Sequence, residues 1–280
     1  MVNMLGDDER TIVIGALADG NSIRAVERQT GIYRNTIMKL GVTVGEECQR
    51  ILDTKMRNLK CKRLELDEIW GYVAKKEAHV AKRDPKTLVG DMWTFVAIDA
   101  ATKLVPCFRI GKRDARTANA FLVDLASRLN NRVQLSTDGL KAYIDAVERG
   151  FGGECDYGQI VKSYAVKEGD DTAGMAQRKY SPPEVVKITK AVISGSPDMD
   201  LVSTSYVERQ NLTMRMSIRR LTRLTNAFSK KLRNFKAAIA LHYAVYNFVR
   251  VHGTIKATPA MAAGVAERPW TIRELVELTT

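Results

Sequence analysis

The middle of the chain alternates between short apolar runs and longer stretches with helical spacing. Three runs rich in Val, Ile, Phe and Trp predict strands, over residues 63–73, 91–100 and 103–111. Apolar residues then recur at helical spacing across residues 114–131, at Ala118, Phe121, Leu122, Leu125 and Leu129. The pattern continues with a strand, a helix and a strand, over residues 132–139, 140–150 and 157–166. This order of elements indicates a mixed α/β domain.

Three strands, a helix, a strand, a helix and a strand are consistent with an RNase H-like mixed sheet with flanking helices. We expect this catalytic domain to span residues 61–256. Residues 166–203 are rich in Gly, Pro, Asp and Ser, so they predict an insertion or a long loop rather than a core element. Two long helices are predicted over residues 203–224 and 228–252, followed by a C-terminal tail at 257–280.

The first sixty residues predict an all-α domain that precedes the sheet. A helix ends at Gly20, and Asn21 or Ser22 can cap a second helix that Gly31 ends. A third helix follows, which makes a helix-turn-helix pattern. Its first turns would carry Arg34, Asn35 and Lys39 as DNA contacts. A plain three-helix cap without a DNA role fits the same pattern equally well.

The charge of the chain favours a polyanionic partner. Its 280 residues carry a formal net charge of +12, with a pI near 9.6, and nucleic acid is the simplest such partner. No run approaches ~20 apolar residues, so no membrane span is expected. The N-terminus lacks a secretory pattern, and the four cysteines include no C-x-x-C pair. These features predict a cytoplasmic protein without a zinc module or disulfides.

Three acids occupy positions where a fold of this kind could bring them together. Asp67 lies within the first strand, Asp138 ends the fourth, and Glu208 lies near the start of a late helix. Phosphodiester chemistry uses Mg²⁺ ions held by carboxylates, and Mg²⁺ keeps several waters, so a few acids suffice. Each acid also has an ordinary explanation: an ion pair for Asp67, a turn for Asp138 and a helix-dipole contact for Glu208. The neighbouring Glu68 is an equally good acid on the opposite strand face.

The predicted helix that carries Glu208 is strongly basic. Glu208, Asn211, Arg215 and Arg219 recur every three or four residues, so they would share one face, with Arg223 continuing it. One carboxylate followed by guanidinium groups suits a metal beside a phosphate backbone. A solvated basic face is the usual alternative.

Several blocks resemble bacterial transposases of the insertion-sequence-one type. They are LELDEIWGYV, STDGLKAY, STSYVERQNLTMRMSIRRLTRLTNAFSKKL and YNFVRVHGTIKATPAMAAG. The resemblance runs from Leu64 to the C-terminus. It implies an RNase H-like core with an Asp-Asp-Glu triad at Asp67, Asp138 and Glu208, which holds Mg²⁺, or Mn²⁺ in its place, and it selects Asp67 over Glu68. The cysteine-rich zinc-binding start common in that family is absent.

The last of these blocks contains Arg250 and His252, which are accessory candidates. His252 could assist proton transfer or contact a phosphate, and a helix-terminal histidine favoured by the dipole is the alternative. The resemblance implies a bacterial, nucleoid-associated protein.

Our main hypothesis is therefore a transposase that cleaves element ends and transfers their 3′-hydroxyls to target DNA. Because two ends must meet, we expect a homodimer or larger assembly on double-stranded DNA. A non-catalytic helix-turn-helix regulator derived from a transposase is the alternative. A structure-selective nuclease on the same fold is a third class.

Overall fold

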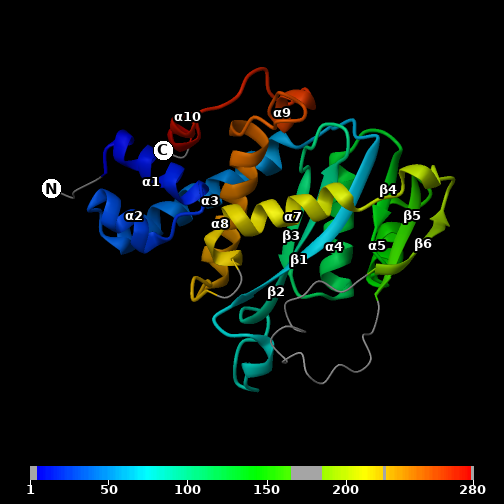
Figure 1. Ribbon diagram of the computed structural model, residues 1–280, viewed down its shortest axis with the longest axis horizontal. Coiled ribbons are helices and arrows are strands. Elements are labelled where there is room, and N and C mark those ends of the chain that lie inside the picture. The colour runs from blue at the N-terminus through cyan, green and yellow to red at the C-terminus, as the bar shows by residue number, and fades with distance from the viewer. Residues whose placement is uncertain (1–4, 165–184, 223–224, 279–280) are drawn as a thin grey trace.

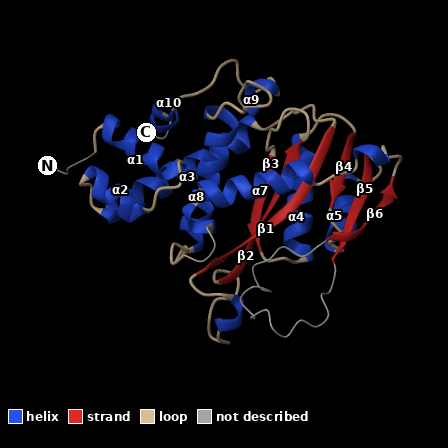
Figure 2. Ribbon diagram, viewed as in Figure 1, coloured by secondary structure: helices blue, strands red, loops and turns tan. Residues whose placement is uncertain are grey.

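One sheet organises the computed structural model, which describes residues 5–164, 185–222 and 225–278. Within these residues the strands lie in the order β3-β2-β1-β4-β5-β6 (Figure 2). Strands β1 (Arg63–Val73), β2 (Gly90–Asp99) and β3 (Cys107–Gly111) form an antiparallel meander. On the other side of β1, strands β4 (Val133–Thr137) and β5 (Cys155–Tyr164) run parallel to it. The first and fourth predicted strands are therefore neighbours in the sheet.

Helices cover both faces of this sheet (Figure 1). On one face lie α4 (Ala115–Arg128) and α5 (Ala142–Phe151), and on the other lie α7 (Ser205–Ser217) and α8 (Leu232–Ala244). Two neighbours in β3 illustrate the division. The Cys107 thiol donates to Asp124 of α4, whereas the Phe108 ring packs on Tyr243 of α8, with centroids 4.8 Å apart. The apolar side chains of α8 are buried in the core of their own chain.

Helices α1 (Asp7–Ala18), α2 (Ile23–Thr30) and α3 (Arg34–Lys55) form the N-terminal region. Of the two candidate caps, it is the Ser22 hydroxyl that caps α2, and Gly31 ends the helix as predicted, with φ of 74°. A small core of Val13, Val26 and Ile37 holds these helices together. The second half of α3 belongs to the main core and crosses α8 so closely that a Cβ on Gly45 would lie 2.2 Å from the Ala237 carbonyl oxygen.

Residues 185–194 correct the expectation of a loop across 166–203. They form β6 (Val185–Ser194), an edge strand antiparallel to β5. Eight of its ten residues are exposed, so β6 lies outside the core. Its β-branched run favours a strand, and pairing with β5 provides the hydrogen bonds. Residues 165–184 lie outside the described part of the chain.

The two long helices predicted near the C-terminus are shorter in the structure. Helix α7 ends at Ser217 because Ile218 adopts an extended conformation, which lets Ile218 and Leu221 reach the core. A 3-10 turn (Arg219–Leu221) follows, and a π-helical turn (Val245–Val249) follows α8. The tail contains α9 (Pro259–Ala262) and α10 (Ile272–Glu277). No helix among the described residues is long and apolar enough to span a membrane.

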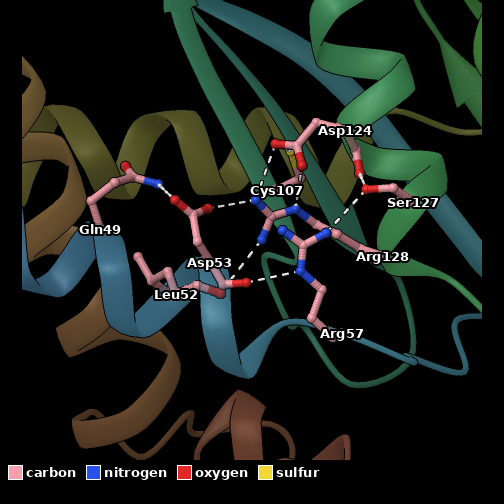
Figure 3. Close-up of polar contacts among 8 residues, drawn as sticks. All are labelled: Gln49, Leu52, Asp53, Arg57, Cys107, Asp124, Ser127 and Arg128. Carbon is pink, nitrogen blue, oxygen red and sulfur yellow. Dashed lines mark hydrogen bonds and ion pairs between the residues drawn. The ribbon is translucent and has the colours of Figure 1, made fainter.

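A buried arginine links α3 to α4 (Figure 3). Arg128 is 4% exposed, and its guanidinium contacts Asp53 of α3 at 2.6 Å and Asp124 of its own helix at 2.9 Å. Burial opposes ionisation of Asp124, but the hydrogen bond and the charge of Arg128, with smaller contributions from Cys107 and Arg57, together outweigh burial and lower the pKa of that carboxyl. A second arginine, Arg57, donates to the Asp53 carbonyl and to Ser127. The network attaches the N-terminal helices to the sheet.

We therefore expect Arg128→Met to lower the free energy of unfolding by about 2–4 kcal/mol, because it leaves two carboxylates without their shared cation. Urea unfolding at neutral pH measures this loss. Arg50→Met removes an exposed pair with Glu47 and should cost under about 0.5 kcal/mol. Equal losses in the two variants would contradict the role given to Arg128.

Candidate functional site

Parallel pairing of β1 and β4 brings the first two predicted acids together. Leu66 is paired with Thr137, so the next residues on the two strands, Asp67 and Asp138, lie side by side. Strand β4 ends at Thr137, and the Asp138 carboxylate accepts from the Leu140 N–H at 3.0 Å, which turns the chain into α5. The Asp-Gly pair therefore has both a turn role and a place in the site.

A third carboxylate joins them, and it belongs to Glu68. Within the described residues, single oxygens of Asp67, Glu68 and Asp138 all lie within 4.8 Å of one another. Glu68 faces α5, where it accepts from the Tyr143 hydroxyl at 3.0 Å. It also accepts, at 2.6 Å, from Nε of Arg113, which lies between β3 and α4. Arg113 also lies 3.9 Å from Asp138 and stacks over Trp93. The Arg113 guanidinium therefore compensates the charge of Glu68.

Asp67 faces α7, on the other side of the sheet. Its carboxylate accepts from Asn211 Nδ2 at 2.8 Å and from the Glu68 N–H at 2.8 Å. Burial, followed by repulsion from Glu68, raises the pKa of Asp67 to about 7, and Asp138 and Glu208 add to the repulsion. Such a carboxyl gains strongly from a bound cation.

Asn211 corrects an expectation of the sequence analysis. It was predicted to contact DNA on an exposed basic face, but its side chain is buried against Asp67. Among the described residues, its Oδ1 atom has no hydrogen-bond partner. Asn211 therefore orients the Asp67 carboxylate.

Helix α7 is positioned by a buried acid that the sequence analysis missed. Glu65 is fully buried, and its Oε2 accepts from the N–H groups of Tyr206 and Val207 at 2.7 and 3.2 Å. These are two of the free N–H groups at the start of α7, where negative charge is favourable. Glu65 precedes Asp67 by two residues, so the period of a strand could have placed both on one face.

Glu208, the third predicted acid, lies on the first turn of α7 and lines the same cleft as Asp67 and Asp138. Its carboxylate is held by the Lys162 ammonium and by the Thr204 hydroxyl, the latter at 2.7 Å. It therefore does not belong to the three-carboxylate cluster. The cleft measures about 710 Å³, and Arg113, Lys141 and Lys162 also line it.

The predicted DNA-binding residues of α3 are exposed. Arg34, Asn35 and Lys39 lie on its first two turns. Arg34 and Asn35 also line a second cleft of about 730 Å³ between the N-terminal helices and the segment after α7, where Arg219 lies opposite. Residues from both predicted DNA-binding groups thus meet on one surface.

The continuous basic stripe predicted after Glu208 is broken. Because α7 ends at Ser217, Arg219 lies in the following 3-10 turn rather than on the face of Glu208. Arg215 donates to the Leu221 carbonyl at 3.4 Å, back across this turn. Arg223 lies outside the described residues.

The accessory candidates lie elsewhere. Arg250 donates to Ser217 and to Asp19 of the N-terminal region, both at 3.2 Å. His252 Nδ1 accepts from the Thr254 N–H at 3.3 Å, and burial followed by the charge of Lys103 lowers the pKa of this imidazole. Neither residue lines the acidic cleft.

The donor set of the acidic cleft fits a hard divalent cation. Carboxylate oxygens are the ligands that Mg²⁺ and Mn²⁺ prefer, and three of them converge here from two strands. Lys162 is paired with Glu208, and Arg113 lies 2.6 Å from Glu68 but 3.9 Å from Asp138, so Asp67 and Asp138 are the acids with the weakest compensation. A cation of charge two matches this pair.

Comparisons with known proteins give likenesses among solved structures. Neither a protein-family model nor a curated protein sequence matches the chain. Among solved structures, it is similar to a piggyBac transposase in a cryo-EM synaptic complex with hairpin DNA, with 10% identity and a TM-score of 0.42. The match covers all of this chain and 73% of that one. At this level the likeness carries no weight for the fold or the site, and membership in the insertion-sequence-one type stays a prediction.

The raised pKa of Asp67 predicts a pH-dependent penalty on the metal-free fold. The folded carboxyl binds its proton more tightly than the unfolded one, so stability is lost as the pH rises from about 4 to 7. Asp67→Asn should be neutral near pH 4 and should stabilise the protein by about 1–3 kcal/mol at pH 8. Denaturant unfolding in EDTA measures this. The exposed Asp145→Asn is the control, and a pH-independent difference for Asp67→Asn would overturn the prediction.

Glu65 gives a second stability prediction. Glu65→Leu removes the acceptor from two buried N–H groups and should cost about 1–3 kcal/mol per unsatisfied group. Glu65→Gln keeps an acceptor oxygen and also removes a buried charge; burial raises the pKa of the Glu65 carboxyl. The loss in free energy of unfolding should therefore be smaller for Glu65→Gln than for Glu65→Leu. Urea unfolding of both variants decides this, and an equal loss would show that α7 does not depend on the acceptor.

Proposed function

We propose that this chain is a DNA transposase of the Asp-Asp-Glu type, which cleaves the ends of an insertion sequence and transfers their 3′-hydroxyls to target DNA. The observation that carries the proposal is the meeting of Asp67 and Asp138 on adjacent parallel strands, with Glu208 in the same cleft. The blocks that resemble the insertion-sequence-one type include all three acids, which adds support.

An RNase H-like core is part of this proposal. An antiparallel meander of β1 to β3, joined through β1 to the parallel pair β4 and β5, is the arrangement that the resemblance implies. In it, the end of β4 lies beside the middle of β1, and a later helix packs over both. Strand β6 extends the sheet beyond this plan.

Mg²⁺ is the proposed cofactor, with Asp67, Asp138 and Glu208 as its ligands, and it would activate the attacking oxygen and stabilise the leaving one. The chain's own residues have distinct tasks. Asn211 orients the Asp67 carboxylate, and Glu65 holds the helix that carries Glu208. Arg113 and Lys141 line the cleft and supply positive charge for a phosphate backbone. Glu68 fixes Arg113 at this wall.

Double-stranded DNA is the proposed partner. A net charge of +12 favours it, and α2, a turn and α3 have the order of a helix-turn-helix, with Arg34, Asn35 and Lys39 exposed at the start of the second helix. This region would read the element ends. Because both ends must be joined together, we propose a homodimer or larger assembly on DNA.

Cleavage of a labelled duplex that carries the DNA flanking this gene tests the proposal. The wild-type protein should nick at the element boundary with Mg²⁺ or Mn²⁺ and not in EDTA. Asp138→Asn should lower the rate at least about 100-fold, because it removes a metal ligand. The exposed Asp145→Asn, on the next helix, should leave the rate unchanged.

The other outcomes identify the alternatives. Specific binding to the ends without nicking by the wild-type protein would favour the non-catalytic regulator. Metal-dependent nicking that ignores the element boundary would favour a structure-selective nuclease. Nicking by Asp138→Asn at the wild-type rate would show that the acids are not the catalytic ligands.

A further inference from the structure

Lys162 occupies a position that neither the resemblance nor the predicted triad assigns. It lies on β5, the strand next to β4, and its ammonium reaches across the cleft to Glu208 of α7. Thr204 donates to the same oxygen of Glu208. The side chains of Lys162 and Glu208 are 25% and 47% exposed, so the pair lies at the open side of the cleft.

This ion pair holds Glu208 away from the other acids. Asp67 and Asp138 contribute oxygens to the cluster within 4.8 Å, and Glu208 does not. Repulsion from Glu208 nevertheless contributes to the raised pKa of Asp67, so its charge is felt at the cluster. Lys162 and Thr204 both hold Oε1 of Glu208 outside the cluster, so a movement of this carboxylate toward a cation at Asp67 and Asp138 would draw it away from Lys162.

We propose that Lys162 exchanges partners: it holds Glu208 in the metal-free protein, and when Glu208 joins a bound cation, Lys162 contacts a phosphate of the DNA in the cleft. The inference rests on the proposed function. An ammonium that loses its carboxylate on a cleft wall with Arg113 and Lys141 is placed for a phosphate oxygen. In the absence of DNA, Lys162 thus competes with the metal for Glu208. When DNA and metal are both bound, it contacts the DNA.

Metal binding without DNA tests the first half. In calorimetric titration with Mn²⁺, Lys162→Met should bind the ion about three- to fivefold more tightly than wild type, because the competing pair is gone. Lys141→Met removes the same charge from the same cleft and reports the general electrostatic gain, which should be smaller. In a Glu208→Gln background, the gain from Lys162→Met should fall to that of Lys141→Met. A gain that survives in this background, or no gain at all, overturns the competition.

DNA binding tests the second half. A duplex of about 30 base pairs is titrated across a salt series, in EDTA and in Ca²⁺, which occupies the acids without supporting cleavage. Lys162→Met should leave the affinity unchanged in EDTA and weaken it in Ca²⁺, with a salt slope lower by about one. Lys162→Arg should restore the slope. Equal loss with and without Ca²⁺ would overturn the exchange and show a permanent contact, and no loss in Ca²⁺ would overturn the phosphate contact.

These equilibrium measurements do not depend on strand cleavage. If the wild-type protein binds Mn²⁺ and DNA but never nicks an element end, the transposase proposal fails, and the two titrations still decide the role of Lys162. If the wild-type protein binds no Mn²⁺, both proposals fail. Thermal unfolding of each variant checks that the fold is kept.

Discussion

The parallel pairing of β1 with β4 is the constraint on which the rest of the site depends. It sets Asp67 beside Asp138 through the backbone register, before any side-chain contact is made. The alternation of β1 then distributes three acids over two faces: Glu65 and Asp67 toward α7, and Glu68 toward α5. One strand thereby connects the helices on both sides of the sheet to a single point.

Concentrating carboxylates at this point carries an electrostatic cost, and the structure shows how it is limited. Glu68 has Arg113 and Tyr143, Glu208 has Lys162 and Thr204, and Glu65 has the start of α7. Within the described part of the chain, Asp67 accepts only from neutral donors, Asn211 and a backbone N–H. The remaining repulsion acts on Asp67, where a bound cation would relieve it. The stability of the fold and the proposed binding of metal are therefore linked through the Asp67 carboxylate.

The N-terminal helices are attached to the sheet by packing and by buried charge. Helix α3 crosses α8 at Gly45, where any larger residue would collide with backbone, and its far end is held by Arg128. Arg34 and Asn35 therefore reach the second cleft on a helix that is fixed at its other end. The proposed reader of DNA and the acidic cleft belong to one packed unit rather than to two loosely tethered parts.

The sequence by itself determined the elements whose pattern is local. The five strands from β1 to β5, the two helices between them and the end of α2 at Gly31 follow from hydrophobic period and turn chemistry, which depend on near neighbours. The sequence offered Asn21 and Ser22 as caps of α2, and the fold uses Ser22. Asp67, Asp138 and Glu208 could be singled out, but only the resemblance chose Asp67 over Glu68, because alternation along a strand cannot tell which face is which.

Tertiary structure decided the remainder. The end of α7 at Ser217 depends on the burial of Ile218 and Leu221, and β6 depends on the open edge of β5. Arg113, Tyr143 and Lys162 join the site from separate elements, at sequence distances of 45 and more from their acidic partners. Such contacts are set by how the layers pack, which no local pattern of residues records.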